Sequence, residues 1–313
     1  MDTTDINIKF DTDGRCNHCI DAETKLPNFI YSEKDEKENI KNLISRVKKR
    51  KSNSKYDSII GLSGGVDSSY VAFIAYENGL NPLCVHFDNG WNSDIAVKNI
   101  KNIINTTGFD LHTEVINWKE FRDLQRSFLL AGVVDIEMLT DHAIFSSLYN
   151  KIKKFDIKTV LSGFNYVTEH GMPTSWTWSK MDFKNIKDIQ KKFGTKSMKT
   201  FPHMSNLKWL VLRRFNFGGV FEDPLNFINF NREKVVDRLI SGFGWQNYGG
   251  KHHESVFTKF YQSYILPKKF NIDKRKVHLS CKIRLKEITR NEALEILSCP
   301  ELIPGKIISK DKF

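Results

Sequence analysis

The sequence lacks the cysteine pattern of a disulfide framework and any apolar segment long enough to span a membrane. Five cysteines, an odd number, occur among 313 residues, which argues against a disulfide framework. No apolar run reaches about 18 residues, so a membrane span is excluded. Residues Met1–Phe10 have no apolar core and do not resemble a signal peptide. These absences predict a cytoplasmic protein with no membrane partner.

Acidic residues are also fewer than basic residues. The chain has 48 Lys+Arg against 37 Asp+Glu, a formal net charge of +11. Such an excess suits polyanionic partners, namely nucleic acid, nucleotides, nucleotide-sugars or an acidic protein. The lysines are spread along the chain, however, as they are on solvated helix faces. Charge alone therefore makes nucleic acid an unlikely partner.

A regular alternation of strand and helix patterns begins after residue 55. Short apolar strands are predicted at 56–61, 82–87, 111–116 and 159–162, with helices between them. Strands separated by helices need crossover connections, which predicts an α/β fold with a doubly wound parallel sheet.

We divide the chain into three predicted segments on this pattern. Residues 1–51 form a Cys-x-x-Cys knuckle and an amphipathic helix, and 52–230 form the α/β domain. Residues 231–313 form a helical C-terminal domain that binds substrate or phosphate and folds against the active face.

The loop after the first strand carries the chemistry. It reads Ser63-Gly64-Gly65-Val66-Asp67-Ser68-Ser69 and leads into a helix. The two glycines let the backbone approach a phosphate, the three serines add hydroxyl donors, and the helix N-terminus favours negative charge. The Asp67 carboxylate would repel a phosphate, so we assign it to Mg²⁺ and to catalysis.

Two other strands end in polar residues. His86, Asp88 and Asn89 close the second strand, and Gly163 follows the fourth. Ligands of open α/β sheets bind beyond the carboxyl ends of the strands. We therefore expect these residues to line the nucleotide site, although Asp88-Asn89-Gly90 alone would read as an ordinary turn.

The loop resembles the signature of the PP-loop ATP pyrophosphatases, which include asparagine synthetase, GMP synthetase and tRNA-thiolating enzymes. It lacks the Gly-Lys-Ser/Thr ending of a Walker-A loop, so kinase or GTPase chemistry is not expected. The resemblance implies a fold of the adenine nucleotide alpha hydrolase-like type.

The C-terminal third of the sequence narrows the resemblance to one family. Residues 244–255 read GWQNYGGKHHES, and 265–270 read ILPKKF. With the earlier segments Asp2–Asp5, Cys16–Cys19 and Asn165–Glu169, they resemble the N-acetyl sugar amidotransferase family of surface-polysaccharide and nonulosonate biosynthesis. The resemblance runs from Asp2 to about Leu297.

The resemblance implies an AMP-forming amidotransferase. The N-acetyl group of a nucleotide-linked acidic sugar would be adenylylated by ATP and converted by ammonia to an acetamidino group. Ammonia would come from separate glutaminase and cyclase-like subunits, because the chain has no glutaminase signature of its own.

Further site residues are predicted in and around these motifs. The candidates for catalysis or charge neutralisation are Lys251, His252, Glu254, Lys259, Lys274 and Arg275, of which Lys274 is assigned to the substrate. Asn165, Glu169 and His170 are candidates for sugar recognition. A solvated basic helix face is the alternative for the basic cluster, and a plain loop is the alternative for Glu169 and His170. Trp176 and Trp178 could stack on a sugar or uracil, although such indoles more often lie in a core.

The cysteine pair departs from the family pattern. Members usually carry an earlier Cys-x-x-Cys that completes a four-thiolate zinc site with the equivalents of Cys16 and Cys19. Here that first pair is missing, so four thiolates cannot close from this segment alone. Either the start is shortened, or His18 or another residue completes the site, or zinc is lost; we expect at most a residual half-site.

Two alternative functions stay open. A tRNA-modifying PP-loop enzyme, by thiolation or lysidine-type ligation, would suit the charge and the Cys-x-x-Cys. No RNA-binding module is recognisable, however, and Cys84 is alone within the α/β domain. A non-catalytic nucleotide-binding scaffold is the other alternative, against which the intact loop argues.

Overall fold

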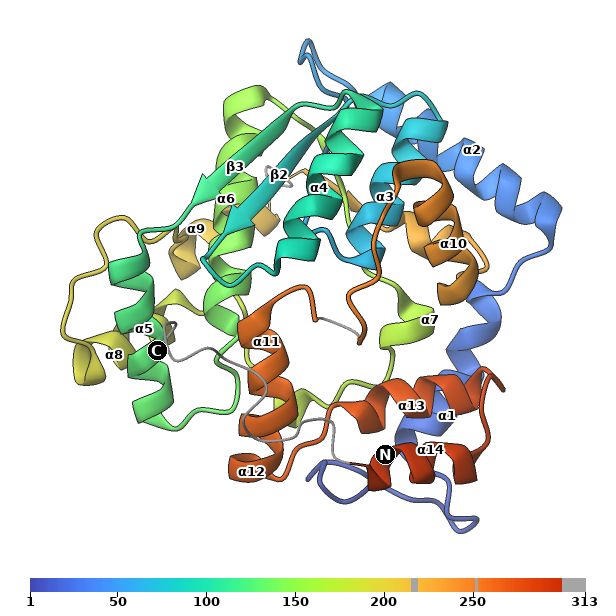
Figure 1. Ribbon diagram of the computed structural model, residues 1–313, viewed down its shortest axis with the longest axis vertical. Helices are drawn as coiled ribbons and strands as arrows, with labels where there is room; N and C mark the ends of the chain where they lie inside the picture. The colour runs from blue at the N-terminus through green and yellow to red at the C-terminus, as the bar shows by residue number, and fades with distance from the viewer. Residues whose placement is uncertain (215–218, 251–252, 300–313) are drawn as a thin grey trace.

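A five-stranded sheet forms the centre of the computed structural model, which describes residues 1–214, 219–250 and 253–299 (Figure 1). The strands are Ser58–Gly61 (β1), Pro82–Asp88 (β2), Leu111–Val115 (β3), Thr159–Leu161 (β4) and Val220–Glu222 (β5). Their order is β3-β2-β1-β4-β5, and each neighbouring pair is parallel. The predicted doubly wound parallel sheet is confirmed. The strand order reverses between β1 and β4, where ligands of such sheets bind.

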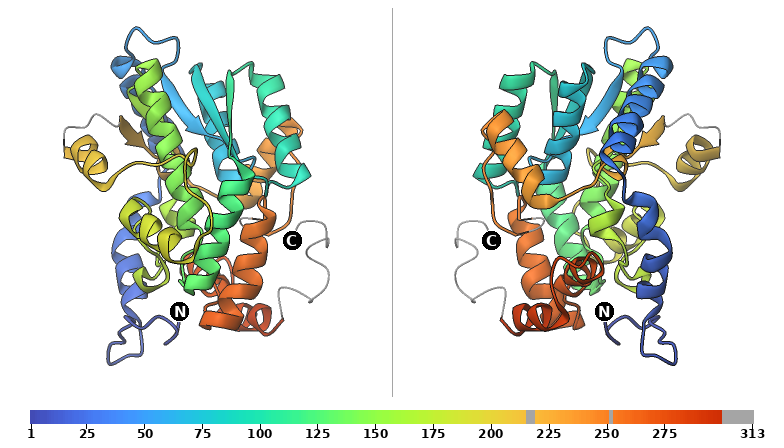
Figure 2. Two further views of the ribbon diagram at one scale, coloured as in Figure 1. Left: turned by 90° about the vertical axis from the view of Figure 1, so that its left-hand side faces the viewer. Right: turned by 90° about the vertical axis from the view of Figure 1, so that its right-hand side faces the viewer.

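Helices cover both faces of the sheet, because its strands bury apolar side chains on both sides. Ile60 of β1 belongs to one core and its neighbour Ile59 to another. The first core is closed by α2 (Glu33–Arg50), α3 (Val66–Glu77), α4 (Asp94–Thr107) and α10 (Arg232–Phe243). The other is closed by α6 (Met138–Phe155) and α9 (Asn206–Arg214). Figure 2 shows α9 and β5 projecting at one edge.

A third core lies beyond the ends of the strands. It joins α5 (Trp118–Ala131), α6 and α8 (Phe183–Phe193) to the C-terminal helices. Those helices are α11 (Val256–Phe260), the π-helical turn η4 (Tyr261–Ile265), α12 (Leu266–Phe270) and α13 (Arg275–Arg284). The last helix, α14 (Arg290–Ser298), packs on α13. Figure 1 shows them beside the carboxyl edge of the sheet. The shorter elements are α1 (Asn17–Lys25), α7 (Tyr166–Glu169), η1 (Leu26–Phe29), η2 (Thr174–Trp176) and η3 (Pro224–Phe227).

Local sequence signals account for several helix ends. A capping box begins α14, with Thr289 and Glu292 bonding reciprocally. Ser93 caps α4, and Gly108 ends it in the left-handed conformation at φ 68°. These signals act within a few residues, which is why the sequence alone reveals them.

One strand was not predicted from the sequence. The fifth strand was missed because it is short and lies at the sheet edge, with Val220 and Phe221 exposed. Glu222 nevertheless anchors it, pairing with Arg46 at 2.8 Å. The cysteine knuckle stays a prediction; there, a bridge between Phe10 and Cys16 leads directly into α1.

The predicted division at residues 51/52 and 230/231 stays a prediction. Residues of all three segments share one core, since Leu43, Val71 and Leu239 pack in the same cluster. Within the part of the chain that the structure describes, no helix has both the length and the apolar character needed to cross a bilayer.

We predict a pH-dependent contribution to stability from Asp123. This buried carboxylate accepts hydrogen bonds from Gln190, Thr195 and Lys196, tying α5 to the end of α8. Burial opposes ionisation, but these bonds lower the pKa of Asp123 to about 2. Its contribution is therefore complete above the unfolded pKa near 3.8 and lost as pH falls toward 2.

Asp123→Asn should lower the free energy of unfolding by about 1–3 kcal/mol at neutral pH. Denaturant titrations should show this deficit shrinking as the pH falls below about 4. A deficit that stayed constant down to low pH would contradict the assignment.

Candidate active site

The loop between β1 and α3 gathers two hydroxyls at a helix N-terminus. Ser68 Oγ accepts a hydrogen bond from the backbone N–H of Ser63 at 3.2 Å, and Ser63 Oγ accepts one from Gly65 N–H at 3.2 Å. The two Oγ atoms lie 3.1 Å apart. Gly65 is the N-cap of α3 and has extended backbone angles. The loop therefore presents hydroxyls and amides together, as an anion site requires.

Gly64 is required by close packing as well as by its conformation. Its φ is +78°, and a Cβ atom there would lie 2.3 Å from the carbonyl oxygen of Ala96 on α4. The Gly64 carbonyl accepts hydrogen bonds from Asn99 Nδ2 at 3.3 Å and from Trp245 Nε1 at 3.1 Å. The loop is thus held by α4 and by the C-terminal segment at once.

A cavity of about 320 Å³ opens at this loop, and we call it the loop cavity. Its walls are Ser63, Gly65, Val66, Asp67, Ser68, Gly163, Phe164, Glu169, Arg232, Tyr248 and Glu254. Seven of these were predicted from the sequence. Gly163 allows a close approach, since a Cβ atom there would lie 3.3 Å from the backbone nitrogen of Ser68.

Sequence reasoning missed Arg232 and Tyr248. Arg232 begins α10 and brings a positive charge to the loop cavity. Tyr248 accepts a hydrogen bond from the Val66 N–H at 3.1 Å. Their position at the loop depends on tertiary structure, because α10 reaches the loop through its packing on α3.

Glu254 lies against the loop from the C-terminal side. Its Oε1 would be 2.9 Å from a Cβ atom on Gly65, and its backbone carbonyl accepts a hydrogen bond from Ser93 N–H at 2.8 Å. Burial raises the pKa of the Glu254 carboxyl above its usual range.

A second cavity of about 370 Å³, the strand-end cavity, adjoins the first. Its walls are Gly61, Leu62, Ser63, Val85, His86, Phe87, Asn89, Asn92, Glu137, Thr140, Asp141, Ile144, Lys180, Glu254, Ser255, Thr258, Gln262 and Lys274. Ser63 and Glu254 belong to both cavities. A ligand that reaches from one cavity to the other therefore passes between these two side chains.

His86 is held neutral in the strand-end cavity. Asn92 Nδ2 donates to His86 Nε2 at 3.2 Å, so Nδ1 carries the proton and donates to the Leu62 carbonyl at 3.0 Å. Burial lowers the pKa of His86, in agreement with this tautomer. Asp88 accepts from Gly90 N–H and Asn92, so it shapes the turn and is absent from the cavity wall. Its predicted contact with the nucleotide stays a prediction.

Charged groups of both signs line the far end of the strand-end cavity. Lys274 Nζ lies 3.2 Å from Glu137, and Lys180 Nζ lies 2.7 Å from Asp135 and 3.1 Å from Asp141. Burial raises the pKa of Asp141. The Glu137 pKa is lowered despite burial, chiefly by Lys274. Lys274 was predicted; the others were not, because they come from α6 and from the segment before α8.

Three predicted residues face the protein interior. Ser69 is fully buried on the core side of α3, so it is removed from the predicted phosphate contacts. Asn165 is also fully buried and caps α7 through Val167 N–H. His170 is buried, and its Nδ1 bonds the carbonyls of Tyr166 and Val167. Asn165 and His170 therefore support α7, and their predicted role in sugar recognition stays a prediction.

Arg275 is also structural. It pairs with Asp273 at 2.8 Å and donates to the carbonyls at the end of α14, including that of Cys299 at 2.7 Å. Its predicted catalytic role stays a prediction. Lys259 lies half-buried on α11 and lines neither cavity. Lys251 and His252 lie outside the described residues.

Cys16 and Cys19 lie together, with their Sγ atoms 3.5 Å apart. Burial opposes ionisation of Cys19, but Arg284 and Cys16 lower its pKa. His18, the predicted completing ligand, instead bonds Asp5 at 2.8 Å. Among the described residues no cluster of three or more His, Cys, Asp or Glu could hold a metal. The donor set there does not fit a four-ligand zinc site.

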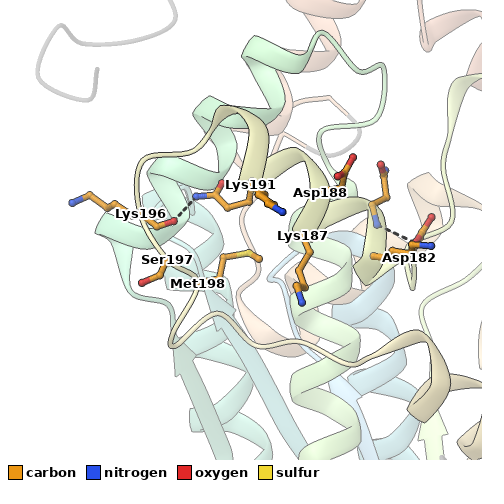
Figure 3. A pocket seen from close by; sticks show the side chains of 10 residues that line it. Asp182, Lys187, Asp188, Lys191, Lys196, Ser197 and Met198 are labelled. Carbon is orange, nitrogen blue, oxygen red and sulfur yellow. Dashed lines mark hydrogen bonds between the residues drawn. The ribbon is translucent and has the colours of Figure 1, made fainter.

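A further cavity of about 650 Å³ lies elsewhere, along α8 (Figure 3). Lys187, Lys191 and Lys196 line it together with Asp182 and Asp188. The Trp176 side chain is buried in the core, whereas the Trp178 side chain is exposed. Neither tryptophan lines the loop cavity or the strand-end cavity.

Two protein families match the chain. Residues 57–203 match the family described as queuosine biosynthesis protein QueC, which has a PP-loop domain. Residues 254–312 match the C-terminal domain of WbpG-like LPS biosynthesis proteins. The resemblance read from the sequence is thereby confirmed, with a PP-loop domain followed by a WbpG-like domain. A search of curated proteins gives no match.

Solved structures give remote similarities. NMN synthetase from Francisella tularensis is 14% identical with a TM-score of 0.35, covering 72% of this chain and 96% of that one. NH3-dependent NAD synthetase from Campylobacter jejuni is 14% identical with a TM-score of 0.34, covering 67% and 93%. A predicted subunit of tRNA methyltransferase from Methanocaldococcus jannaschii is 13% identical with a TM-score of 0.32, covering 58% and 72%.

We predict that Gly64→Ala will distort the loop and weaken ATP binding strongly. The added methyl would collide with the Ala96 carbonyl and occupy a left-handed backbone, costing about 2–4 kcal/mol of stability. Calorimetric ATP titration and thermal unfolding measure the two effects.

The matched control is Gly79→Ala, where φ is +63° and a Cβ atom would meet nothing within 4 Å. It should cost about 1–2 kcal/mol and leave ATP binding intact. Equal ATP affinities for the two variants would contradict a role for the Gly64 contact.

Proposed function

The chain joins a QueC-type PP-loop domain to a WbpG-like C-terminal domain, and we propose that it is an ATP-dependent amidotransferase acting on a nucleotide-linked N-acetyl sugar. The N-acetyl group becomes an acetamidino group, ammonia is consumed, and AMP and pyrophosphate are released. The family description, LPS biosynthesis, supports a sugar of a surface polysaccharide as the substrate.

One observation carries this proposal. The WbpG-like match begins at Glu254, the residue that lies between the loop cavity and the strand-end cavity. The same match supplies Ser255, Thr258, Gln262 and Lys274 to the strand-end cavity. The segment related to polysaccharide synthesis therefore forms a wall beside the predicted ATP site, where an acceptor sugar has to bind.

The first chemical step activates an amide. Its oxygen is a poor leaving group, so it attacks the α-phosphorus of ATP and expels pyrophosphate. Ser63, Ser68 and the amides at the start of α3 receive the negative charge of the leaving pyrophosphate. Arg232 adds a positive charge on the opposite wall. Most of the rate comes from holding these groups in place.

Asp67 and the loop hydroxyls fit a magnesium ion. Mg²⁺ in proteins is held by one or two carboxylates together with substrate phosphates. Asp67 is half-buried and lines the loop cavity beside Ser63 and Ser68. When bound, the ion neutralises phosphate charge; Asp67 supplies the carboxylate that holds it against the loop.

The second step replaces AMP by nitrogen. Ammonia attacks the carbon of the adenylylated amide, and AMP leaves with the former amide oxygen. We assign the ammonia supply to partner glutaminase and cyclase-like subunits. The chain then needs a nucleotide site and a sugar site, which its two joined cavities offer.

A tRNA-modifying function is the second candidate. The cavity along α8 is rich in lysine (Figure 3), and the description of the QueC family is queuosine biosynthesis. Binding to bulk tRNA at about 0.15 M salt, where contacts from charge alone fade, would favour it.

The decisive test is conversion of ATP to AMP and pyrophosphate with ammonium chloride and a panel of UDP- and CMP-linked N-acetyl sugars. We expect AMP with one class of sugar, and a product about one dalton lighter by mass spectrometry, since NH replaces O. AMP formed with tRNA but with none of the sugars would overturn the proposal.

Asp67→Ala should reduce AMP formation by about 100-fold or more, because a phosphate-neutralising ligand is lost. The melting temperature should change by no more than about 2 °C, since Asp67 is half-buried at a loop. The exposed Asp237→Ala is the control and should keep full activity. Normal AMP formation by Asp67→Ala would rule out the magnesium role.

A further inference from the structure

The loop between β1 and α3 donates several of its backbone N–H groups to side chains of the chain itself. Ser63 N–H donates to Ser68 Oγ and Gly65 N–H donates to Ser63 Oγ, both at 3.2 Å. These two bonds close within the loop. The third is different, because Val66 N–H donates at 3.1 Å to the hydroxyl of Tyr248, which is 182 positions away in the sequence. A distant segment therefore holds one donor of the anion site.

The Val66 N–H is a donor that a phosphate at this helix end needs. Val66 is the first residue of α3, and the first amides of a helix have no partner within the helix. They lie at the positive end of the helix dipole, which is why anions bind there. Val66 is only 2% exposed, so water has little access to it. Its N–H therefore needs an oxygen atom from the chain or from a ligand.

Tyr248 is placed by neighbours that pack on α4. Gln246 exchanges two hydrogen bonds with Asn99, from its N–H to Oδ1 at 2.8 Å and from Nδ2 to its carbonyl at 2.9 Å. The Trp245 and Tyr248 rings meet edge to face, with their centroids 5.4 Å apart. These contacts fix the backbone just before Tyr248 and direct its ring to the start of α3.

The Tyr248 hydroxyl also joins the loop to Glu254. Burial raises the pKa of the Glu254 carboxyl, and a hydrogen bond with Tyr248 opposes that rise. Glu254 Oε1 lies against Gly65, where a Cβ atom would be 2.9 Å away. Both side chains line the loop cavity. Oxygen atoms of the chain thus occupy the space beside Gly65 and Val66 that phosphate oxygens would take.

We propose that Tyr248 is a positioning residue whose hydroxyl stands in for a phosphate oxygen at the Val66 amide and is displaced when the phosphates of ATP bind. This inference rests on the proposed function, since it takes the loop as the pyrophosphate site. No covalent bond changes, because the Val66 N–H exchanges one oxygen acceptor for another. The exchange keeps the start of α3 hydrogen-bonded with and without nucleotide, and it weakens ATP binding by the strength of the Tyr248 bond.

The displacement predicts the sign of a mutational effect. If the Tyr248 hydroxyl contacted the phosphates directly, its loss would weaken their binding. If the hydroxyl competes with them, its loss frees the Val66 N–H and strengthens their binding. The net contribution of one such hydrogen bond corresponds to about 3- to 10-fold in affinity.

Calorimetric titration with inorganic pyrophosphate in magnesium chloride measures this effect. We expect Tyr248→Phe, which keeps the ring on Trp245, to lower the Kd for pyrophosphate by about 3- to 10-fold. The matched control is Tyr76→Phe, because Tyr76 is exposed at the other end of the same helix. Its Kd should equal that of the wild-type protein.

Thermal unfolding adds a readout that a merely structural role would not move. Without pyrophosphate, Tyr248→Phe should melt below the wild-type protein, because the Val66 N–H has lost its acceptor. With saturating pyrophosphate the deficit should disappear, because the tighter binding of the variant offsets the lost bond.

The outcomes separate this inference from the proposed function. If the wild-type protein binds neither pyrophosphate nor ATP, the ATP-dependent function fails and this inference fails with it. If the wild-type protein binds both, and Tyr248→Phe binds pyrophosphate with equal or lower affinity, the displacement of Tyr248 alone is overturned. A melting deficit that persisted in saturating pyrophosphate would overturn it as well.

Discussion

The Gly64 carbonyl is the point at which three parts of the chain meet. It accepts hydrogen bonds from Asn99 on α4 and from Trp245 after α10, while the Gly64 backbone lies against Ala96. Any side chain at Gly64 would push α4 away from the loop. Because both donors are tied to this one carbonyl, the anion-binding shape of the loop depends on how α4 and α10 pack on α3. The loop and the core of the sheet therefore fold as one unit.

That packing also brings the C-terminal segment to the loop. Beyond Trp245 the chain runs past the loop with Tyr248 on the first amide of α3 and Glu254 against Gly65. Ser255 forms a bridge with Asn92 after β2, which fixes the segment to the end of a second strand. The loop cavity and the strand-end cavity then adjoin at Ser63 and Glu254.

Residues predicted from the sequence fall into two groups. Those within the loop motif, such as Ser63, Asp67 and Ser68, reach the loop cavity because strand, turn and helix follow one another directly. The second group lies outside that cavity and includes Ser69, at the end of the loop motif, and Asn165, from a segment that carries the family resemblance. The helical repeat of α3 and the cap of α7 turn these two side chains into the interior.

The sequence by itself determined the parallel α/β fold, the loop and its anion-binding character, because turn residues and apolar periodicity act over a few positions. It did not reveal β5, whose strand is an exposed edge of three residues. Tertiary structure decided that Arg232, Tyr248, Lys180 and Asp141 join the site. These side chains come from α6, the segment before α8 and the region around α10, and long-range core packing sets their positions.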